Sequence, residues 1–509
     1  MRAPRRDRYQ GVLHLCAGIG ILGFGLSGCM VGPDYEKPQL VMPDSWHVEL
    51  VDGLQSGNSD PGAWWLEFDD PMLVELVFLA ERRNLDLRSA VSSIREARAQ
   101  YGIAASDLFP QVSLNTTADF MSGSSRTPEI DMGSMELIYE DQAYHMGLDL
   151  GWEVDLWGKV RRSMESAQAE IAMTVEDWRD ILVTIRAEVA QSYISVRSFQ
   201  LQISSLKKTI ESQTQTLKLV KQQYGAGVSD ELQVAQAEAS VADVEAQLPM
   251  LVESLAESIN RLSVLIGEAP GPLRDRLAAV EPVPQPPNEI GVGIPADIIR
   301  RRPDIRAAER SLASATAKVG VAEAALFPAL QITGTGGFSS NDLSKWFTSQ
   351  SLGGVLGIQV SWPFFTAGRL LNVVKVTNEQ TLQALYSYEK TVLSAIEDVE
   401  NALIAYAQTL REREQLRRSV EAYQRVVNLA QERYKSGADD LQTLLYAERY
   451  LFQSEQTLAQ VEGQVSANVV ILYKALGGAW EIVPKGTSGA ETVAKEEDHE
   501  SKQKQEIPG

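Results

Sequence analysis

The sequence predicts a mixed α/β membrane protein made of two tandem repeats, each with two transmembrane β-strands and a pair of long antiparallel coiled-coil helices. Three observations carry this prediction. The two halves of the chain repeat one another at a fixed spacing. Each half holds a pair of segments in which apolar and polar residues alternate, and each then continues in a long stretch without proline or glycine.

The N-terminus has the pattern of a secretory signal that ends at a lipid-attachment cysteine. Residues 2–8 are basic, and residues 11–28 carry no charge. The sequence Leu26-Ser-Gly-Cys29 resembles the lipobox of bacterial lipoproteins, in which the cysteine is acylated and becomes the first residue after cleavage. Two acyl chains suffice for stable anchoring. The alternative is a short membrane helix, but the apolar run is near the lower limit of what spans a bilayer.

The charge and cysteine content narrow the possible partners and chemistry. Residues 1–28 carry four arginines and one aspartate, a net +3, so their removal takes the formal charge from −21 to −24. Such an acidic balance disfavours nucleic acid and anionic membrane surfaces as partners. Of the two cysteines, Cys16 leaves with the signal and Cys29 remains. No disulfide within the mature chain is therefore expected.

The internal repeat sets the domain organisation. Asn84-Leu-Asp-Leu-Arg88 and Arg302-Pro-Asp-Ile-Arg306 match, as do the Leu-Phe-Pro motifs at 108–110 and 326–328, all at an offset of 218. Farther along the chain the offset stays at 210, which excludes chance. We attribute the difference to a longer loop in the first half, from Met121 to Asp141. The pairs at 210 include Trp152 and Trp362, Gly158 and Gly368, Tyr224 and Tyr434, Gly227 and Gly437, Glu238 and Glu448, and Gly267 and Gly477.

The segments after each Leu-Phe-Pro motif predict strands, because their hydrophobicity has a period of two. The predicted strands cover about residues 111–120, 144–154, 329–338 and 354–364. Their length of about ten residues is that of a transmembrane β-strand. His145 falls on the polar face, where we expect it to line a lumen. Residues 346–368 are uncharged and long enough for a membrane helix, but their glycines, Pro363 and alternating pattern favour a strand.

Residues 159–224 and 369–434 lack proline and glycine and predict two helices approaching ~100 Å in length. Their apolar residues recur at coiled-coil spacing. Glycine-containing turns then break the chain, and a second helix is predicted to run back from about Ser229 to Leu265 and from Asp439 to Leu476. Each half also begins with a helical stretch before its first strand. A helical bundle or scaffold would explain the helices but not the paired strands and the lipobox.

These elements divide the chain into six segments. A proline-rich irregular connection lies between the repeats, and the polar C-terminal end has no apolar period and is expected to be disordered. The segments are a lipoprotein signal peptide (1–28), a lipid-anchored N-terminal segment (29–70), a first repeat (71–268), a connecting equatorial segment (269–300), a second repeat (301–483) and the disordered tail (484–509).

Four strands cannot close a barrel, and an open sheet edge in lipid leaves backbone groups unpaired at several kcal/mol each. The chain is therefore expected to oligomerise. Two copies would give 8 strands and three copies 12, and the polar side chains on the inner face predict a wet lumen.

The residues after Cys29 then carry a family resemblance. Val31-Gly-Pro-Asp-Tyr35, Trp64-Trp65 and Ile294-Pro-Ala-Asp297 with Arg302-Pro-Asp304 resemble motifs of TolC-like outer-membrane efflux lipoproteins of RND-type (NodT-like) efflux systems. The resemblance covers about residues 26–480. It implies a homotrimer with a 12-stranded β-barrel in the outer membrane, joined to a long periplasmic α-helical barrel. It also implies a periplasmic adaptor and an inner-membrane pump as partners, outer-membrane lipid around the barrel, and no cofactor.

In that arrangement the turns between the paired helices form the periplasmic tips. The resemblance makes Gly225, Gly227 and Gly437 candidates for adaptor docking and Asp230, Asp439 and Asp440 candidates for an aperture of carboxylates, which would favour cations. The alternative for these residues is helix capping, which would account well for Ser229 and Asp439. TolC itself has its acidic ring six and nine residues beyond the tip glycine, where this chain has Thr443 and Tyr446.

No catalytic or metal-binding set is apparent in the sequence. The histidines of the mature chain, His47, His145 and His499, are far apart, and the chain has no phosphate-binding loop with lysine. Together with the predicted architecture and the family resemblance, this favours a passive outer-membrane efflux duct as the function. A periplasm-spanning scaffold without a pore and a lipoprotein hydrolase remain the alternatives. The sequence does not identify the exported substrate.

Overall fold

The computed structural model describes residues 30–40, 42–48, 50, 53–55, 62–124, 138–287, 289–478 and 480. The predicted signal peptide, Cys29 and the predicted disordered tail lie outside the described residues. The chain divides into two compact units. Unit 1 comprises residues 1–41, 89–178 and 304–393, and unit 2 comprises residues 42–88, 179–303 and 394–509.

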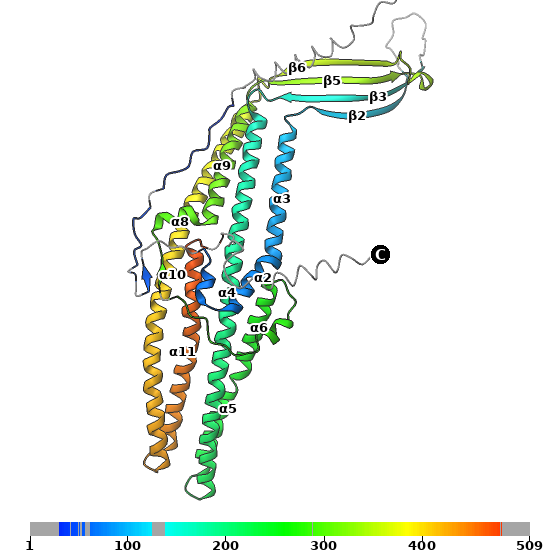
Figure 1. Cartoon of the computed structure of the whole chain (residues 1–509). Helices are drawn as coiled ribbons and strands as arrows, with labels where there is room; N and C mark the ends of the chain where they lie inside the picture. The colour runs from blue at the N-terminus through cyan, green and yellow to red at the C-terminus, as the bar shows by residue number, and fades with distance from the viewer. Residues whose placement is uncertain are drawn as a thin grey trace, which may run out of the picture. The chain divides into compact units, whose positions relative to one another are not determined.

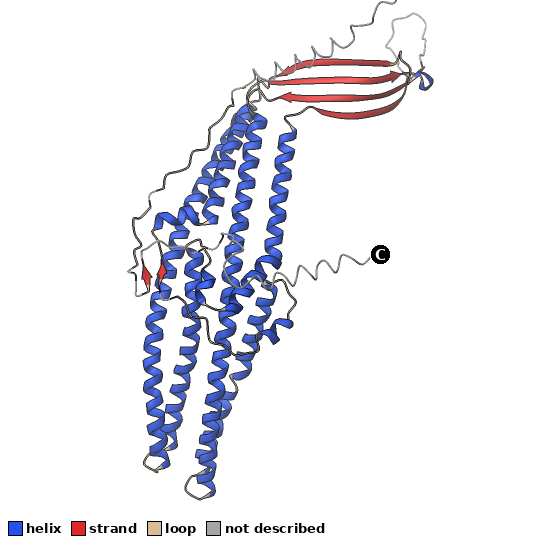
Figure 2. Ribbon diagram, viewed as in Figure 1, coloured by secondary structure: helices blue, strands red, loops and turns tan. Residues whose placement is uncertain are grey.

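Unit 1 contains a four-stranded antiparallel sheet in the order β2-β3-β5-β6 (Figure 1). Each repeat supplies one hairpin, and β3 pairs with β5 to join the two hairpins (Figure 2). The strands are β2 (Gln111–Ser124), β3 (Ile138–Val154), β5 (Ala329–Ser340) and β6 (Leu352–Ser361). Four strands were predicted, and all four are present.

The strand bounds differ from the prediction at the hairpin ends. β2 and β3 continue into the segment predicted as a loop between Met121 and Asp141, of which residues 125–137 are not described. β6 ends before Pro363, because proline cannot donate a ladder hydrogen bond. The alternative of a membrane helix over residues 346–368 is wrong, since this segment contains β6. No helix among the described residues is long and apolar enough to span a membrane.

The strand register places the apolar residues on one face of the sheet. Leu114 of β2 pairs with Leu148 of β3, which pairs with Gly336 of β5. Two residues farther along each strand, the next row on this face consists of Val112, Leu150, Gly334 and Leu356. On the other face, His145 lies between Thr117 and Ser339, as expected for the polar side. The alternation predicted from sequence is confirmed.

Two helices of equal length follow the hairpins in the sequence. Helix α4 (Lys159–Gly225) and helix α10 (Arg369–Lys435) each have 67 residues. Both begin after a glycine with positive φ, Gly158 at 80° and Gly368 at 81°. These bounds agree with the predicted helices, because no proline or glycine interrupts the hydrogen-bond ladder.

The returning helices differ between the repeats. Helix α11 (Leu441–Ala475) is continuous, whereas the first repeat has α5 (Glu231–Glu245) and α6 (Leu248–Leu265). The prediction of one helix from Ser229 to Leu265 is therefore wrong. Pro249 lies in the first turn of α6, and its ring and missing N–H disfavour a continuous helix through Glu245.

The helices before the strands are also divided, at equivalent residues. Asn84 separates α2 (Pro71–Arg83) from α3 (Leu85–Ser106), and Arg302 separates α8 (Pro295–Arg301) from α9 (Pro303–Ala324). Within unit 2, the Asn84 side chain donates to the carbonyl oxygen of Leu265 over 2.9 Å. Arg302 donates to the carbonyl oxygen of Ala475 over 3.0 Å. Each break therefore contacts the end of the returning helix of its own repeat.

The connection between the repeats is more regular than predicted. It contains helix α7 (Pro272–Arg276), strand β4 (Ile290–Gly291) and the start of α8. Strand β4 pairs in parallel with β1 (Leu54–Gln55). The segment is thus held to the N-terminal part of unit 2 by backbone hydrogen bonds.

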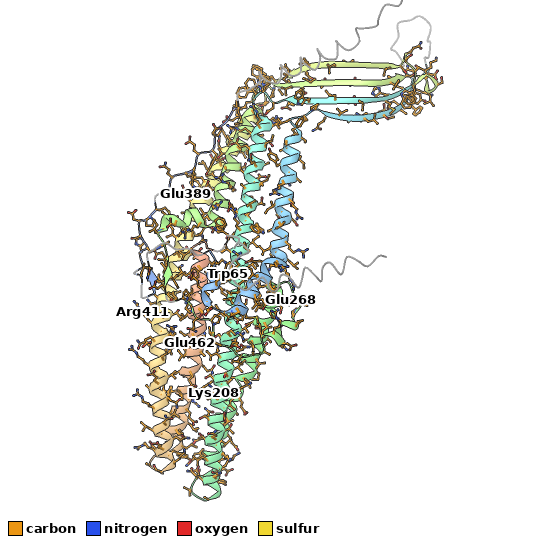
Figure 3. The ribbon with its side chains drawn as sticks, in the orientation of Figure 1. Trp65, Lys208, Glu268, Glu389, Arg411 and Glu462 are labelled. Carbon is orange, nitrogen blue, oxygen red and sulfur yellow. The ribbon has the colours of Figure 1, made fainter. Side chains whose placement is uncertain are left out.

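Part of the core of unit 2 forms around a short 3-10 helix, η1 (Trp64–Phe68). Trp65 is fully buried and lies among the helices of this unit (Figure 3). The Arg186 guanidinium lies 4.5 Å from the centre of the Trp65 ring. Trp64 stacks on Tyr473 of α11 with ring centres 5.7 Å apart. The tryptophan pair thus joins the N-terminal segment to helices of both repeats.

Candidate functional site at the helix-hairpin tips

The turns between the paired helices have the same backbone geometry in both repeats. Gly227 has φ of 73° and Gly437 has φ of 70°, in the left-handed region where glycine carries no steric cost. The amide of Val228 donates to the carbonyl of Gln223, and the amide of Ala438 donates to that of Arg433. Glycine therefore ends each long helix and reverses the chain.

Gly225, the third docking candidate, is the last residue of α4 rather than part of the turn. A Cβ added at Gly225, Gly227 or Gly437 would meet no other atom within 4 Å among the described residues. The backbone of both turns is therefore accessible in the single chain.

Asp230 and Asp440 cap the helices that follow the turns. Asp230 accepts a hydrogen bond from the amide of Gln233 at 2.9 Å, and Asp440 accepts one from the amide of Thr443 at 2.9 Å. The Thr443 hydroxyl also donates to Asp440. These bonds lower the pKa of Asp440, the backbone bond most strongly, so its carboxylate is ionised at neutral pH.

Asp439 is not the helix cap that the sequence analysis considered. Its carboxylate forms an ion pair with Arg433 of α10, with 3.0 Å between Nε and Oδ2. Ser229 bonds through its hydroxyl to Gln233. The prediction that Ser229 and Asp439 are the caps is therefore wrong by one residue in each repeat, since the capping side chain must lie at the last non-helical position.

A hydrogen bond and an apolar cluster join the two hairpins above the turns. The Tyr434 hydroxyl of α10 donates to Gln223 Oε1 of α4 over 2.6 Å. The apolar cluster combines residues of both repeats. It comprises Val220, Ala237, Val427, Ala430, Tyr434, Leu441, Leu444 and Ala447. The two hairpins of one chain thus form one packed assembly.

A buried carboxyl group lies at the contact between the hairpins. Glu448 of α11 is almost fully buried, and its Oε1 accepts from the buried Thr216 hydroxyl of α4 at 2.8 Å. Its Oε2 is buried without a hydrogen-bond partner among the described residues. Burial raises the pKa of Glu448, and the Thr216 hydrogen bond partly offsets this shift.

Sequence reasoning placed Tyr434 and its counterpart Tyr224 alike on the coiled-coil seams of the long helices, and it assigned no role to Glu448. The structure distinguishes the two members of each repeated pair. Glu238 is half-exposed and pairs with Lys221 at 2.7 Å, and Tyr224 is exposed. The repeated sequence therefore gives equivalent positions, but the packing of the two hairpins against each other buries only one member of each pair.

The predicted aperture residues thus lie at two tips of one packed assembly. Asp230 and Asp440 are exposed, and Asp439 is partly covered and paired. Among the described residues, no group of three or more His, Cys, Asp or Glu side chains could hold a metal ion. The tips therefore offer acceptor oxygens and open backbone rather than a preformed metal centre.

Comparison with known proteins finds a family model and relatives that match most of this chain. The model of the family described as outer membrane efflux protein matches residues 76–268 and 294–478. The chain is 32% identical over 472 residues to the solvent efflux pump outer membrane protein SrpC of Pseudomonas putida, covering 90% of this chain and 97% of that protein. It is 31% identical over 467 residues to nodulation protein T of Rhizobium leguminosarum bv. trifolii, covering 90% and 96%.

A solved structure extends the similarity to three dimensions. The outer-membrane channel OprN superposes with a TM-score of 0.80 at 33% identity, over 89% of this chain and all of that one. OprN is an outer-membrane channel, and SrpC is the outer-membrane protein of a solvent efflux pump.

Proposed function

Because this chain belongs to the outer membrane efflux protein family, we propose that it is the outer-membrane channel component of a tripartite efflux system, a passive trimeric exit duct. The observation that carries the proposal is the four-stranded sheet of unit 1, with one apolar face and two open edges. A scaffold without a pore would not need that apolar face, because water would surround it.

The open edges explain why copies must associate. β2 lies at one edge and β6 at the other. In lipid, their unpaired backbone groups would each cost several kcal/mol. When β6 of one copy pairs with β2 of the next, three copies close a 12-stranded barrel around the polar face, and the paired helices continue into the periplasm as a helical barrel.

The partners and location follow from the same proposal. The duct lies in the outer membrane, is anchored by acylated Cys29 and extends into the periplasm. There the tips with Gly225, Gly227 and Gly437 dock a periplasmic adaptor that connects the duct to an inner-membrane pump. The energy for transport comes from that pump. The carboxylates of Asp230, Asp439 and Asp440 from three copies surround the narrow periplasmic mouth. Their negative charge favours the passage of cations over anions.

The oligomer tests the duct directly. Purified protein in detergent is expected to have three times the mature mass and, reconstituted in a bilayer, to conduct ions. A trimer that never conducts would favour the pore-free scaffold. A stable folded monomer in lipid would contradict both the barrel and the duct.

The anchor is tested by Cys29→Ser. We expect this variant to lose incorporation of a fatty-acid probe and to keep an uncleaved or differently cleaved precursor. Unchanged labelling would remove the assignment of Cys29, and it would leave the channel proposal in place.

The gate is tested by charge removal at the tips. The double variant Asp439→Asn, Asp440→Asn is expected to raise the resting conductance and to weaken block by divalent cations added on the periplasmic side. Glu414→Gln is the matched control, because Glu414 is an exposed carboxylate of α10 that pairs with Arg418 in the same helix. Full cation block in the double variant would exclude these two residues and direct attention to Asp230.

A pure capping role predicts a different result. Asparagine caps a helix about as well as aspartate, whereas alanine at position 440 would destabilise the start of α11 by about 1 kcal/mol. In that case cation block would be the same in wild type and in both variants.

A further inference from the structure

The segment that follows the lipid-attachment cysteine lies against the junction between sheet and helix in unit 1. The amide of Val31 donates to the carbonyl oxygen of Trp157 over 3.1 Å. A Cβ at the neighbouring Gly158 would lie 2.6 Å from the Met30 side chain. Trp157 and Gly158 lie between the end of β3 and the start of α4, so the segment begins at one margin of the sheet.

One buried arginine binds this segment. The Arg162 side chain is 1% exposed and donates to the carbonyl oxygens of Val31 and Gly32, each at 3.0 Å. It also bonds to Asp34 and to Glu165, each at 2.7 Å. A buried guanidinium is costly unless its donors are satisfied, and two of the acceptors here are backbone oxygens that only this path of the chain can supply.

Two glycines provide the space that the segment needs. Gly32 has φ of 90°, and a Cβ on it would overlap the backbone of Gly320 in α9. A Cβ on Gly320 would in turn lie 2.8 Å from Cγ, Cδ and Nε of Arg162. Any larger side chain at either position would displace the segment or the arginine. The close approach is therefore built into α4 and α9.

Further contacts hold the same segment farther along. The Arg310 guanidinium lies 5.4 Å from the centre of the Tyr35 ring, and Lys37 pairs with Glu309 at 2.8 Å. These two contacts are on α9, so residues 31–37 are held by helices of both repeats.

We propose that Arg162 is a positioning residue for the lipid anchor. It fixes residues 31–34 at the base of the sheet, so that the acyl chains on Cys29 enter the membrane at the level where the strands end. This inference rests on the proposed acylation of Cys29. Consecutive Cα atoms are about 3.8 Å apart, so the anchor cannot lie far from Met30. Sheet and acyl chains therefore enter one bilayer in a fixed relation.

The test is release of the anchor by limited proteolysis of the acylated protein in membranes. A glutamate-specific protease can cut after the exposed Glu36 and thereby separate a fatty-acid label from the rest of the chain. Before digestion, Arg162→Ala is expected to carry as much label as wild type. During digestion, its label should be released at least about tenfold faster than that of wild type, the factor that corresponds to about 1.4 kcal/mol. Arg162→Lys, which keeps the charge but not the forked donors, should be intermediate.

A second variant covers the possibility that Arg162→Ala does not fold. Gly32→Ala displaces the segment from its own side and leaves Arg162 in place, so it should give the same faster release. Lys318→Ala is the matched control, because Lys318 is an exposed cation of α9 that pairs with Glu170 and does not contact the segment in any described interaction. Trimer mass and melting temperature establish that each variant is folded.

The outcomes separate the two proposals. Release within twofold of wild type in every folded variant among Arg162→Ala and Gly32→Ala overturns the positioning role. Release that is equally fast in Lys318→Ala overturns it as well, because the effect would then be general loosening. Absence of label from the wild-type chain would instead refute the anchor at Cys29.

Discussion

Replacing Thr216 by valine is expected to weaken the contact between the two hairpins, and by more at high pH than at low pH. The Thr216 hydroxyl donates to Glu448 over 2.8 Å, and both side chains are buried. A hydrogen bond to a neutral group contributes about 1 kcal/mol, and one to a charged group about 1.5–3 kcal/mol. The variant should therefore lose about 1 kcal/mol while Glu448 is protonated and about 1.5–3 kcal/mol once it is ionised.

The sign of the pH dependence follows from the pKa of Glu448, which burial raises. An acid whose pKa is higher in the folded than in the unfolded protein contributes stability that is complete below the unfolded-state pKa. This stability is lost as pH rises through the folded-state pKa, at about 1.4 kcal/mol for each unit of difference. Because the Thr216 bond lowers the folded-state pKa, valine raises it further and the loss of stability with pH becomes larger.

Hydrogen exchange of the amides around positions 216 and 448 in the assembled trimer measures the local opening free energy. It should be compared at pH 5 and pH 8 after correction for the intrinsic exchange rate. Thr214→Val is the control, because Thr214 is exposed and donates only to the carbonyl of Ile210 in its own helix. A Thr216→Val effect that is the same at both pH values, or no larger than that of the control, would refute the reasoning.

Three further predictions concern the rest of the fold. Gly337→Ala should abolish the oligomer in mild-detergent gels, because its Cβ would overlap the backbone of β3, whereas Gly336→Ala meets nothing and should not. Asn84→Ala should lower the melting temperature of the trimer, since it loses the bond to Leu265 and the cap of α3, about 2 kcal/mol together. Gly437→Ala should accelerate exchange at the second tip, because a left-handed alanine costs about 1–2 kcal/mol.

The two equivalent tryptophans, Trp152 and Trp362, show how much of the structure the internal repeat predicted. The offset of 210 predicted that Trp152 and Trp362 are equivalent, and each indole donates to the carbonyl of the leucine in its own Leu-Phe-Pro motif, Leu108 and Leu326. The distances are 3.0 Å and 3.1 Å. The partners lie 44 residues apart in the first half and 36 in the second, and the repeat supplies both of them, so equivalent residues form the base of each hairpin.

Helix interruptions mark where sequence reasoning was too coarse. Pro249 was available in the sequence and should have divided the helix that returns to Leu265. The division at Asn84 carries no such signal. There the side chain caps α3 and reaches Leu265, a residue far along the chain, so the break is stabilised by tertiary contacts.

The sequence by itself determined the tandem repeat, the strands with one apolar face and the two long helices, because periodicity and the absence of proline and glycine act within a few turns of the chain. Only the tertiary structure decided that Glu448 is buried while Glu238 is exposed, that Asp439 pairs with Arg433, and that Arg162 binds the segment after Cys29. Burial and pairing depend on which faces of distant helices meet, and the spacing of residues along a single chain does not contain that information.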